Sequence, residues 1–230
     1  MMLGILGGMG PLATAVFYRK VVELTKAQTD ADHIETVIYS NPGIPDRTSF
    51  ITGQGGEDPY PLIRESAIKL ARMGADVIAV PCVTSGFWSE ELSRDVEIPV
   101  LNGIKETAER LKAQGIKKAG ILATEGTLTG GFLTRVFNAC GIDVILPDEK
   151  DRQITTELIY DSVKAGTSCD KNILLTLRDD LLAAGAETVV AGCTEHSCIR
   201  DELGISEGFI DILDVLAEEA ILMAGGELRV

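Results

Sequence analysis

The chain has 230 residues, of which 45% are hydrophobic and 24% are charged, and its formal net charge is −14 at pH 7. This length and composition fit one large or two small globular domains. The acidic balance argues against nucleic acids and anionic membranes as partners, because both repel a negative surface. No apolar run reaches the roughly 20 residues of a transmembrane helix. The apolar N-terminus lacks the basic residues of a signal peptide, so we predict a cytoplasmic protein.

Strands and helices are expected to alternate through the first half. Continuous apolar runs favour strands that are covered on both faces, and helical spacing favours amphipathic helices. The expected strands are Leu3–Gly7, His33–Tyr39, Val77–Val80 and Val100–Leu101. The expected helices are Ala13–Lys26, Pro61–Met73 and Ile104–Gln114. Two prolines predict a loop over Pro42–Thr48.

The second half repeats this alternation. Its expected strands are Ala119–Ala123, Asp143–Leu146 and Thr188–Ala191, and a helix is expected over Ile210–Ala224. Alternating strands and helices predict an α/β fold with parallel sheets, and ligands of such sheets bind beyond the carboxyl ends of the strands. The segments expected at those ends are Gly7–Gly10, Cys82–Gly86, Thr124–Thr127 and Cys193–Glu195.

Two pairs of segments indicate an internal duplication. LGILGGMGPLAT (residues 3–14) aligns without gaps with AGILATEGTLTG (residues 119–130), at an offset of 116 residues. GADVIAVPC ends at Cys82 and GAETVVAGC ends at Cys193, at an offset of 111 residues. We therefore predict a first domain over residues 1–100 and a second over 101–207. The helix at about 208–230 is expected to pack back on the first domain.

The cysteines are the main candidates for chemistry. There are five, with no CxxC pair and no zinc spacing, so they are expected to be free thiols. Cys82 and Cys193 lie at equivalent strand ends, where backbone N–H groups can activate a thiol. Two such thiols facing one cleft would supply the pair of acid/base groups that a cofactor-free proton-transfer enzyme needs. Cys140, Cys169 and Cys198 are expected to serve packing.

Other motifs are less decisive. Gly7-Gly8-Met9-Gly10 does not match a dinucleotide or phosphate-loop pattern, and its glycines would let the backbone approach a small ligand. Arg47 lies either in a surface turn capped by Asp46 or at a site where its guanidinium holds a carboxylate. His33 is expected to be structural, whereas His196 could reach the site. Two histidines argue against a catalytic metal centre.

Six segments together resemble the aspartate/glutamate racemase family, the amino-acid racemases that work without pyridoxal phosphate. They are GILGGMGPLAT, NPGIPDRT, GADVIAVPCVTS, GILATEGT, IYDSVKAG and GCTE, in that order between residues 4 and 195. The resemblance implies two pseudo-symmetric α/β domains, each with a parallel sheet, and an active site in the cleft between them. It also implies a homodimer that needs no cofactor and acts on an amino acid.

The resemblance also implies roles for individual residues. Cys82 and Cys193 look like the two catalytic thiols, one removing the α-proton and the other delivering a proton to the opposite face. Met9 and Gly10 resemble the wall against the substrate, and Arg47 and Lys164 the groups that hold its carboxylates. The remaining contacts to the substrate would be Val83, Thr84, Ser85, Thr127, Thr194 and Glu195.

Three positions depart from the family pattern. Val83 stands where Asn usually follows the first cysteine, Gly86 replaces a His, and His196 replaces an apolar residue. Aspartate or glutamate is the leading substrate, and Val83 leaves a broad-specificity racemase open. The alternatives are a maleate isomerase, a hydantoin racemase or an arylmalonate decarboxylase of the same superfamily. A non-catalytic amino-acid-binding protein is the alternative outside enzymology.

Overall fold

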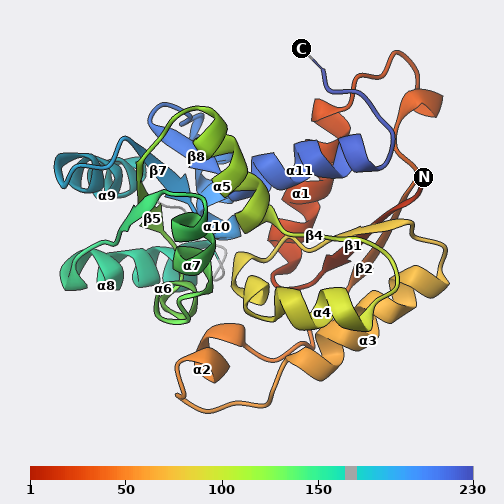
Figure 1. Ribbon diagram of the computed structural model, residues 1–230, viewed down its shortest axis with the longest axis horizontal. Helices are drawn as coiled ribbons and strands as arrows, with labels where there is room; N and C mark the ends of the chain where they lie inside the picture. Colours follow the sequence, from red (N-terminus) through yellow and green to blue (C-terminus); the bar gives the residue numbers. More distant parts are fainter. Residues whose placement is uncertain (164–169, 230) are drawn as a thin grey trace.

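The computed structural model describes residues 1–163 and 170–229, and it has two lobes (Figure 1). The first half of the chain contains, in order, β1 (Leu3–Gly7), α1 (Pro11–Leu24), the short 3-10 helix η1 (Asp30–Asp32), β2 (Thr36–Ser40), α2 (Arg47–Ile51), α3 (Tyr60–Arg72), β3 (Val77–Ala79), the 3-10 helix η2 (Val83–Trp88), α4 (Ser89–Asp95) and β4 (Val100–Leu101).

The second half contains α5 (Gly103–Ala113), β5 (Lys118–Leu122), α6 (Glu125–Thr129), α7 (Phe132–Ala139), β6 (Asp143–Ile145), α8 (Glu149–Glu157), the π-helix η3 (Leu158–Val163), α9 (Lys171–Ala183), β7 (Thr188–Ala191), α10 (Thr194–Leu203), β8 (Phe209–Asp211) and α11 (Ile212–Met223).

Each half forms one parallel four-stranded sheet, in the order β2-β1-β3-β4 and β6-β5-β7-β8. The two orders are equivalent, so the prediction of a duplicated parallel α/β fold is confirmed. The central strands β1 and β5 are flanked on both sides by other strands, and β1 is buried throughout. This burial explains their continuous apolar sequence.

Several predicted boundaries differ from the structure, and two of the differences have a clear physical reason. The helix expected to begin at Ile210 begins at Ile212, because Phe209–Asp211 pairs with β7 as strand β8. Periodicity alone does not separate a short apolar strand from the helix that follows it. The expected loop Pro42–Thr48 ends early, because Arg47 opens α2. Asp46 caps this helix by accepting a hydrogen bond from the Ser49 backbone N–H at 2.8 Å.

The C-terminal helix α11 belongs to the core of the first half. Its Leu213, Leu216 and Ala217 are buried in one apolar cluster with Leu3 and Phe17. Figure 1 shows α11 lying beside α1 in the right-hand lobe. The helix also packs against α5, so it contacts elements of both halves of the chain. Among the described residues, no helix has the length and apolar character needed to cross a membrane.

Candidate active site

The two repeated cysteines lie just beyond the carboxyl ends of β3 and β7. Cys82 directly precedes η2 and Cys193 directly precedes α10, so each sits at the N-terminal end of a helical segment. Their exposed fractions are 7% and 4%. Strand ends of the two halves therefore present two buried thiols beside backbone N–H groups, where the helix dipole favours negative charge.

Both thiols line a single cavity with an empty volume of about 280 Å³. Both halves of the chain contribute to its wall. The lining residues are Met9, Asp46, Arg47, Thr48, Cys82, Val83, Thr84, Thr124, Cys193, Thr194 and Glu195.

The structure places most of the predicted site residues on this wall, and a few elsewhere. Gly10 lines an adjoining cavity together with Arg47 and Glu195. The Ser85 hydroxyl donates a hydrogen bond to the Cys82 carbonyl at 2.6 Å and lines another cavity, behind Cys82. Lys164 lies outside the described residues.

Arg47 brings a buried positive charge to the cavity. Its exposed fraction is 9%. One guanidinium nitrogen donates to the carbonyls of Ile44 (3.2 Å) and Pro45 (2.9 Å), and another donates to the carbonyl of Met9 (3.4 Å). The buried Nε has no hydrogen-bond partner, and no carboxylate of the described residues forms an ion pair with Arg47. A buried charge without a counter-ion is costly, so this arrangement fits a carboxylate supplied by a ligand.

Three threonine hydroxyls form a closed triangle across the two halves. The Oγ1 of Thr84 lies 3.0 Å from that of Thr124 and 3.1 Å from that of Thr127, and the latter two are also 3.1 Å apart. Thr84 comes from the first half and the other two from the start of α6. A ring of three hydroxyls uses each O–H as a donor within the ring, and a hydroxyl can donate to a bound anion when it rotates out of the ring.

Sequence reasoning missed Thr124, Thr48 and Asp46 as wall residues. Thr124 carries a signal that could have identified it, because it is the N-cap of α6 at the end of β5. Thr48 approaches Gly126 so closely that a Cβ atom on that glycine would lie 2.8 Å from the Thr48 Cα. The absence of a side chain at position 126 therefore allows α2 of the first half to close against α6 of the second.

Glu195 gives the two thiols unequal surroundings. The Cys193 thiol donates to Glu195 Oε2 at 2.8 Å, and the Thr194 hydroxyl donates to the same oxygen at 3.1 Å. Only 5% of Glu195 is exposed. The offset of 111 residues that relates Cys82 to Cys193 also relates Thr84 to Glu195. Cys193 thus has a carboxylate where Cys82 has the hydroxyl triangle.

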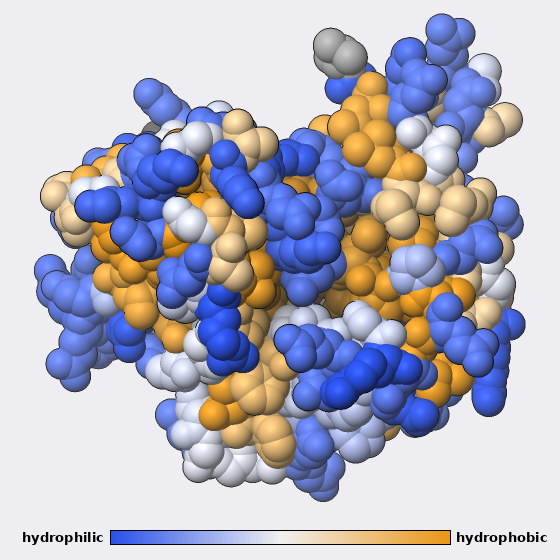
Figure 2. All heavy atoms as spheres, in the orientation of Figure 1, coloured by the Kyte–Doolittle hydropathy of each residue, from blue (hydrophilic) through white to orange (hydrophobic). Residues whose placement is uncertain are grey.

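Val83 and Gly86, two positions expected to depart from the family pattern, have apolar surroundings. Val83 is buried in the apolar cluster that contains Ile104 and Phe132. A Cβ atom on Gly86 would lie 2.7 Å from Ile104 Cδ1 and 3.3 Å from Phe132 Cε2, so these side chains occupy the space of a larger residue. In Figure 2, apolar side chains gather mainly to the right of the middle of the face shown, beside hydrophilic side chains at its centre.

His196 and Cys198 follow Cys193 on α10 but do not line the shared cavity. His196 is fully buried, and burial lowers its pKa to about 4, so the imidazole is neutral at pH 7. Burial raises the pKa of Cys198 to about 12, so that thiol stays protonated. Among the described residues, no three His, Cys, Asp or Glu side chains are grouped to hold a metal ion.

Known proteins are similar to this chain in both sequence and architecture. The chain is 28% identical over 226 residues to the broad specificity amino-acid racemase RacX of Bacillus subtilis, covering 96% of each protein. It resembles the Picrophilus torridus aspartate racemase structure with a TM-score of 0.82 and 29% identity, over 99% of this chain and 96% of that one.

An aspartate racemase homologue from Pyrococcus horikoshii matches with a TM-score of 0.78 and 25% identity, over 97% of this chain and 98% of the other. The family described as Asp/Glu/Hydantoin racemase matches residues 6–220, which include both cysteines and every described wall residue of the cavity. By this match the chain belongs to the Asp/Glu/hydantoin racemase family.

Proposed function

We propose that this isomerase inverts the α-carbon of an amino acid without a cofactor, using Cys82 and Cys193 as its two acid/base groups. The observation that carries the proposal is that a thiol from each half lines one cavity together with the Arg47 guanidinium, which forms no ion pair with any described carboxylate. One thiolate removes the α-proton from one face, and the other thiol delivers a proton to the opposite face. Two groups are needed because a single group would return its proton to the face it came from.

The difficult part of this reaction is the negative charge that develops when the α-proton leaves. The carbanion is an enediolate in which charge moves onto the substrate carboxylate. Arg47, the threonine triangle and the N–H groups at the starts of η2 and α10 are donors fixed in place before the reaction. Preorganised donors in a buried site stabilise such charge more than water does.

Glu195 sets which thiol starts as the acid. A carboxylate 2.8 Å from the Cys193 sulfur favours the protonated thiol, because thiolate and carboxylate would repel each other. Cys82 has no such carboxylate at the equivalent position, so for one enantiomer we assign the proton donor to Cys193 and the base to Cys82. The roles reverse for the other enantiomer.

Aspartate or glutamate is the leading substrate, since Arg47 and the expected role of Lys164 suit carboxylates. Broad specificity is the second candidate, and Val83 favours it: a valine side chain cannot hydrogen-bond a substrate, so this part of the wall selects no polar group. The full-length likeness to a broad-specificity racemase supports the same candidate. We expect the protein to be a cytoplasmic homodimer, which light scattering after size-exclusion chromatography would test.

A chiral assay of both enantiomers of the twenty amino acids in D2O tests the proposal. We expect at least one acidic amino acid to be inverted, with deuterium at the α-carbon of the inverted product. Inversion of several neutral amino acids at comparable rates would select the broad-specificity candidate. Turnover of maleate or hydantoins alone would overturn amino-acid racemisation. Thermal stabilisation by an amino acid without inversion or exchange would indicate a binding protein.

Glu195→Gln removes the charge beside Cys193 and keeps the shape. We expect carbamidomethylation of Cys193 at pH 7, followed residue by residue with mass spectrometry, to become about tenfold faster, because loss of the neighbouring anion favours the thiolate. The rate at Cys82 is expected to stay within about twofold.

Glu125→Gln is the matched control, since Glu125 pairs with Arg152 at 3.4 Å and does not line the cavity. It should leave both thiols unchanged. An unaltered Cys193 rate in Glu195→Gln would contradict the assigned role of the carboxylate.

A further inference from the structure

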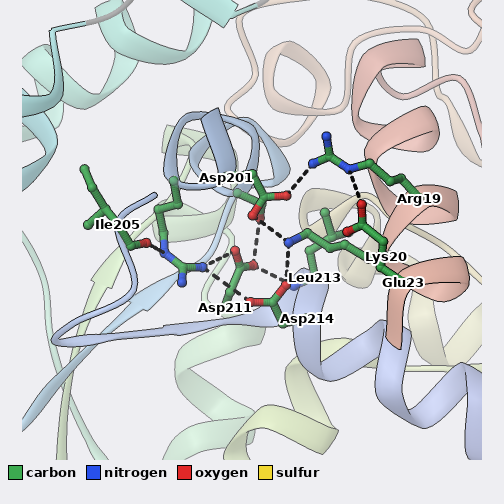
Figure 3. A network of polar contacts seen from close by, with 10 residues as sticks. Arg19, Lys20, Glu23, Asp201, Ile205, Asp211, Leu213 and Asp214 are labelled. Atoms are coloured by element: carbon green, nitrogen blue, oxygen red, sulfur yellow. Dashed lines mark hydrogen bonds and ion pairs between the residues drawn. The ribbon is translucent and has the colours of Figure 1, made fainter. Parts of the chain in front are cut away.

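A network of ion pairs centred on the buried Lys20, Arg200 and Asp211 joins three helices (Figure 3). Lys20 on α1 contacts Asp201 on α10 (2.7 Å) and Asp214 on α11 (2.6 Å). Arg19 adds a second contact from α1 to Asp201, at 2.8 Å. Figure 3 shows the Lys20 ammonium between these two carboxylates. The first half of the chain is therefore tied to α10 through a charge that is largely removed from water.

A second set of contacts fixes α10 against β8 and α11. Arg200 on α10 forms an ion pair with Asp211 and lies 3.6 Å from Asp214. The Ser197 hydroxyl donates to the other Asp211 oxygen at 2.7 Å, and the Leu213 backbone N–H donates to that oxygen at 2.8 Å. Asp211 and Arg200 are both buried. α10 is thus held by contacts to both α1 and α11.

The two helices joined by Lys20 and Asp201 both begin at the active site. α1 starts at Pro11, immediately after Met9 and Gly10, and α10 starts at Thr194, immediately after Cys193. At a rise of about 1.5 Å per residue, Lys20 and Asp201 lie roughly 10–14 Å along their helices from those starts. An ion pair at this distance fixes how the two N-termini face each other.

We infer that Lys20 and Asp201 are positioning residues, whose ion pair sets the orientation of Cys193 toward a substrate held against the Met9–Gly10 wall. The inference rests on the proposed two-thiol function. Cys82 follows β3 and precedes η2, and neither element contributes a residue to this network. Loss of the ion pair should therefore impair proton transfer at Cys193 and spare proton transfer at Cys82.

Variants that keep only one of the two thiols report proton transfer at each face of the substrate α-carbon separately. In Cys82→Ser only Cys193 can exchange the α-proton with D2O, and in Cys193→Ser only Cys82 can. We expect Lys20→Met to slow exchange of the best substrate by about tenfold in the Cys82→Ser background and by less than twofold in the Cys193→Ser background. Lys20→Arg keeps the positive charge, so it should retain most of the exchange rate that Lys20→Met loses.

Arg110→Met is the matched control, because it breaks the 2.6 Å ion pair between Arg110 on α5 and Glu218 on α11 without touching α10. It should change exchange by less than twofold in both backgrounds. Trp88 fluorescence and thermal unfolding test whether Lys20→Met folds. If it does not, Asp201→Asn replaces it, because the Asp201 side chain is more exposed than that of Lys20.

Equal losses in both backgrounds, or no loss in either, would overturn the inference. Absence of exchange in the unmodified protein and in both single-thiol variants would instead refute the proposed function.

Discussion

Replacing either Cys82 or Cys193 by serine is expected to lower racemisation by about 10³-fold or more, because a serine hydroxyl is a far weaker acid and base at neutral pH than a thiol. Each variant should still exchange the α-proton of one enantiomer with D2O, since the remaining thiol can take a proton and return a deuteron to the same face. Chiral chromatography measures inversion, and NMR measures exchange.

The matched control for these variants is Cys198→Ser. Cys198 is on α10 one turn beyond Cys193, and burial raises the pKa of its thiol to about 12. We expect this variant to keep activity within about threefold. Full racemisation by either Cys82→Ser or Cys193→Ser would refute the two-base mechanism. Exchange of both enantiomers in a single-thiol variant would show that one thiol reaches both faces.

Replacing Arg47 by Met is expected to reduce kcat/KM by about 10²- to 10³-fold, since it removes the positive charge assigned to the substrate carboxylate and to the enediolate. Arg47→Lys should recover only part of the activity, because an ammonium cannot donate in the forked geometry of a guanidinium. Steady-state kinetics on both enantiomers of the best substrate measure these effects.

Arg152→Met serves as the control for Arg47. Arg152 pairs with Glu125 and lines a neighbouring groove that shares Asp46 and Thr48 with the cavity. It should change kcat/KM by less than threefold. Added guanidinium should partly restore Arg47→Ala if the loss is a missing donor. Unchanged kcat/KM in Arg47→Met would remove Arg47 from the site.

The fold was predictable because its signals are local in the sequence. Buried parallel strands such as β1 and β7 are continuous apolar runs, and helices such as α3 and α5 have helical spacing. The failures arose where two elements adjoin. β8 runs directly into α11 at Asp211, and α2 opens inside a proline-rich loop, so no change of period marks either boundary.

The candidate site was predictable only in part. Repeat spacing placed Cys82 and Cys193 at equivalent strand ends, and the structure puts both on one cavity. Ser85 was expected to contact the substrate through its hydroxyl, which instead donates to the Cys82 carbonyl. His196 could have reached the site, but it is fully buried beside Glu195, which contacts the thiol. Residues that are adjacent in a helix point in different directions. Their closeness to Cys193 in the sequence therefore did not show which of Glu195 and His196 reaches the thiol.

The amino-acid sequence by itself determined the duplicated parallel α/β architecture and the two thiols at matching strand ends, because strand burial and repeat spacing depend on neighbours along the chain. Tertiary structure alone decided that Thr84 meets Thr124 and Thr127, and that Lys20 meets Asp201, 181 residues away. Such contacts follow from how the two halves pack against each other. No local pattern in the sequence records that packing.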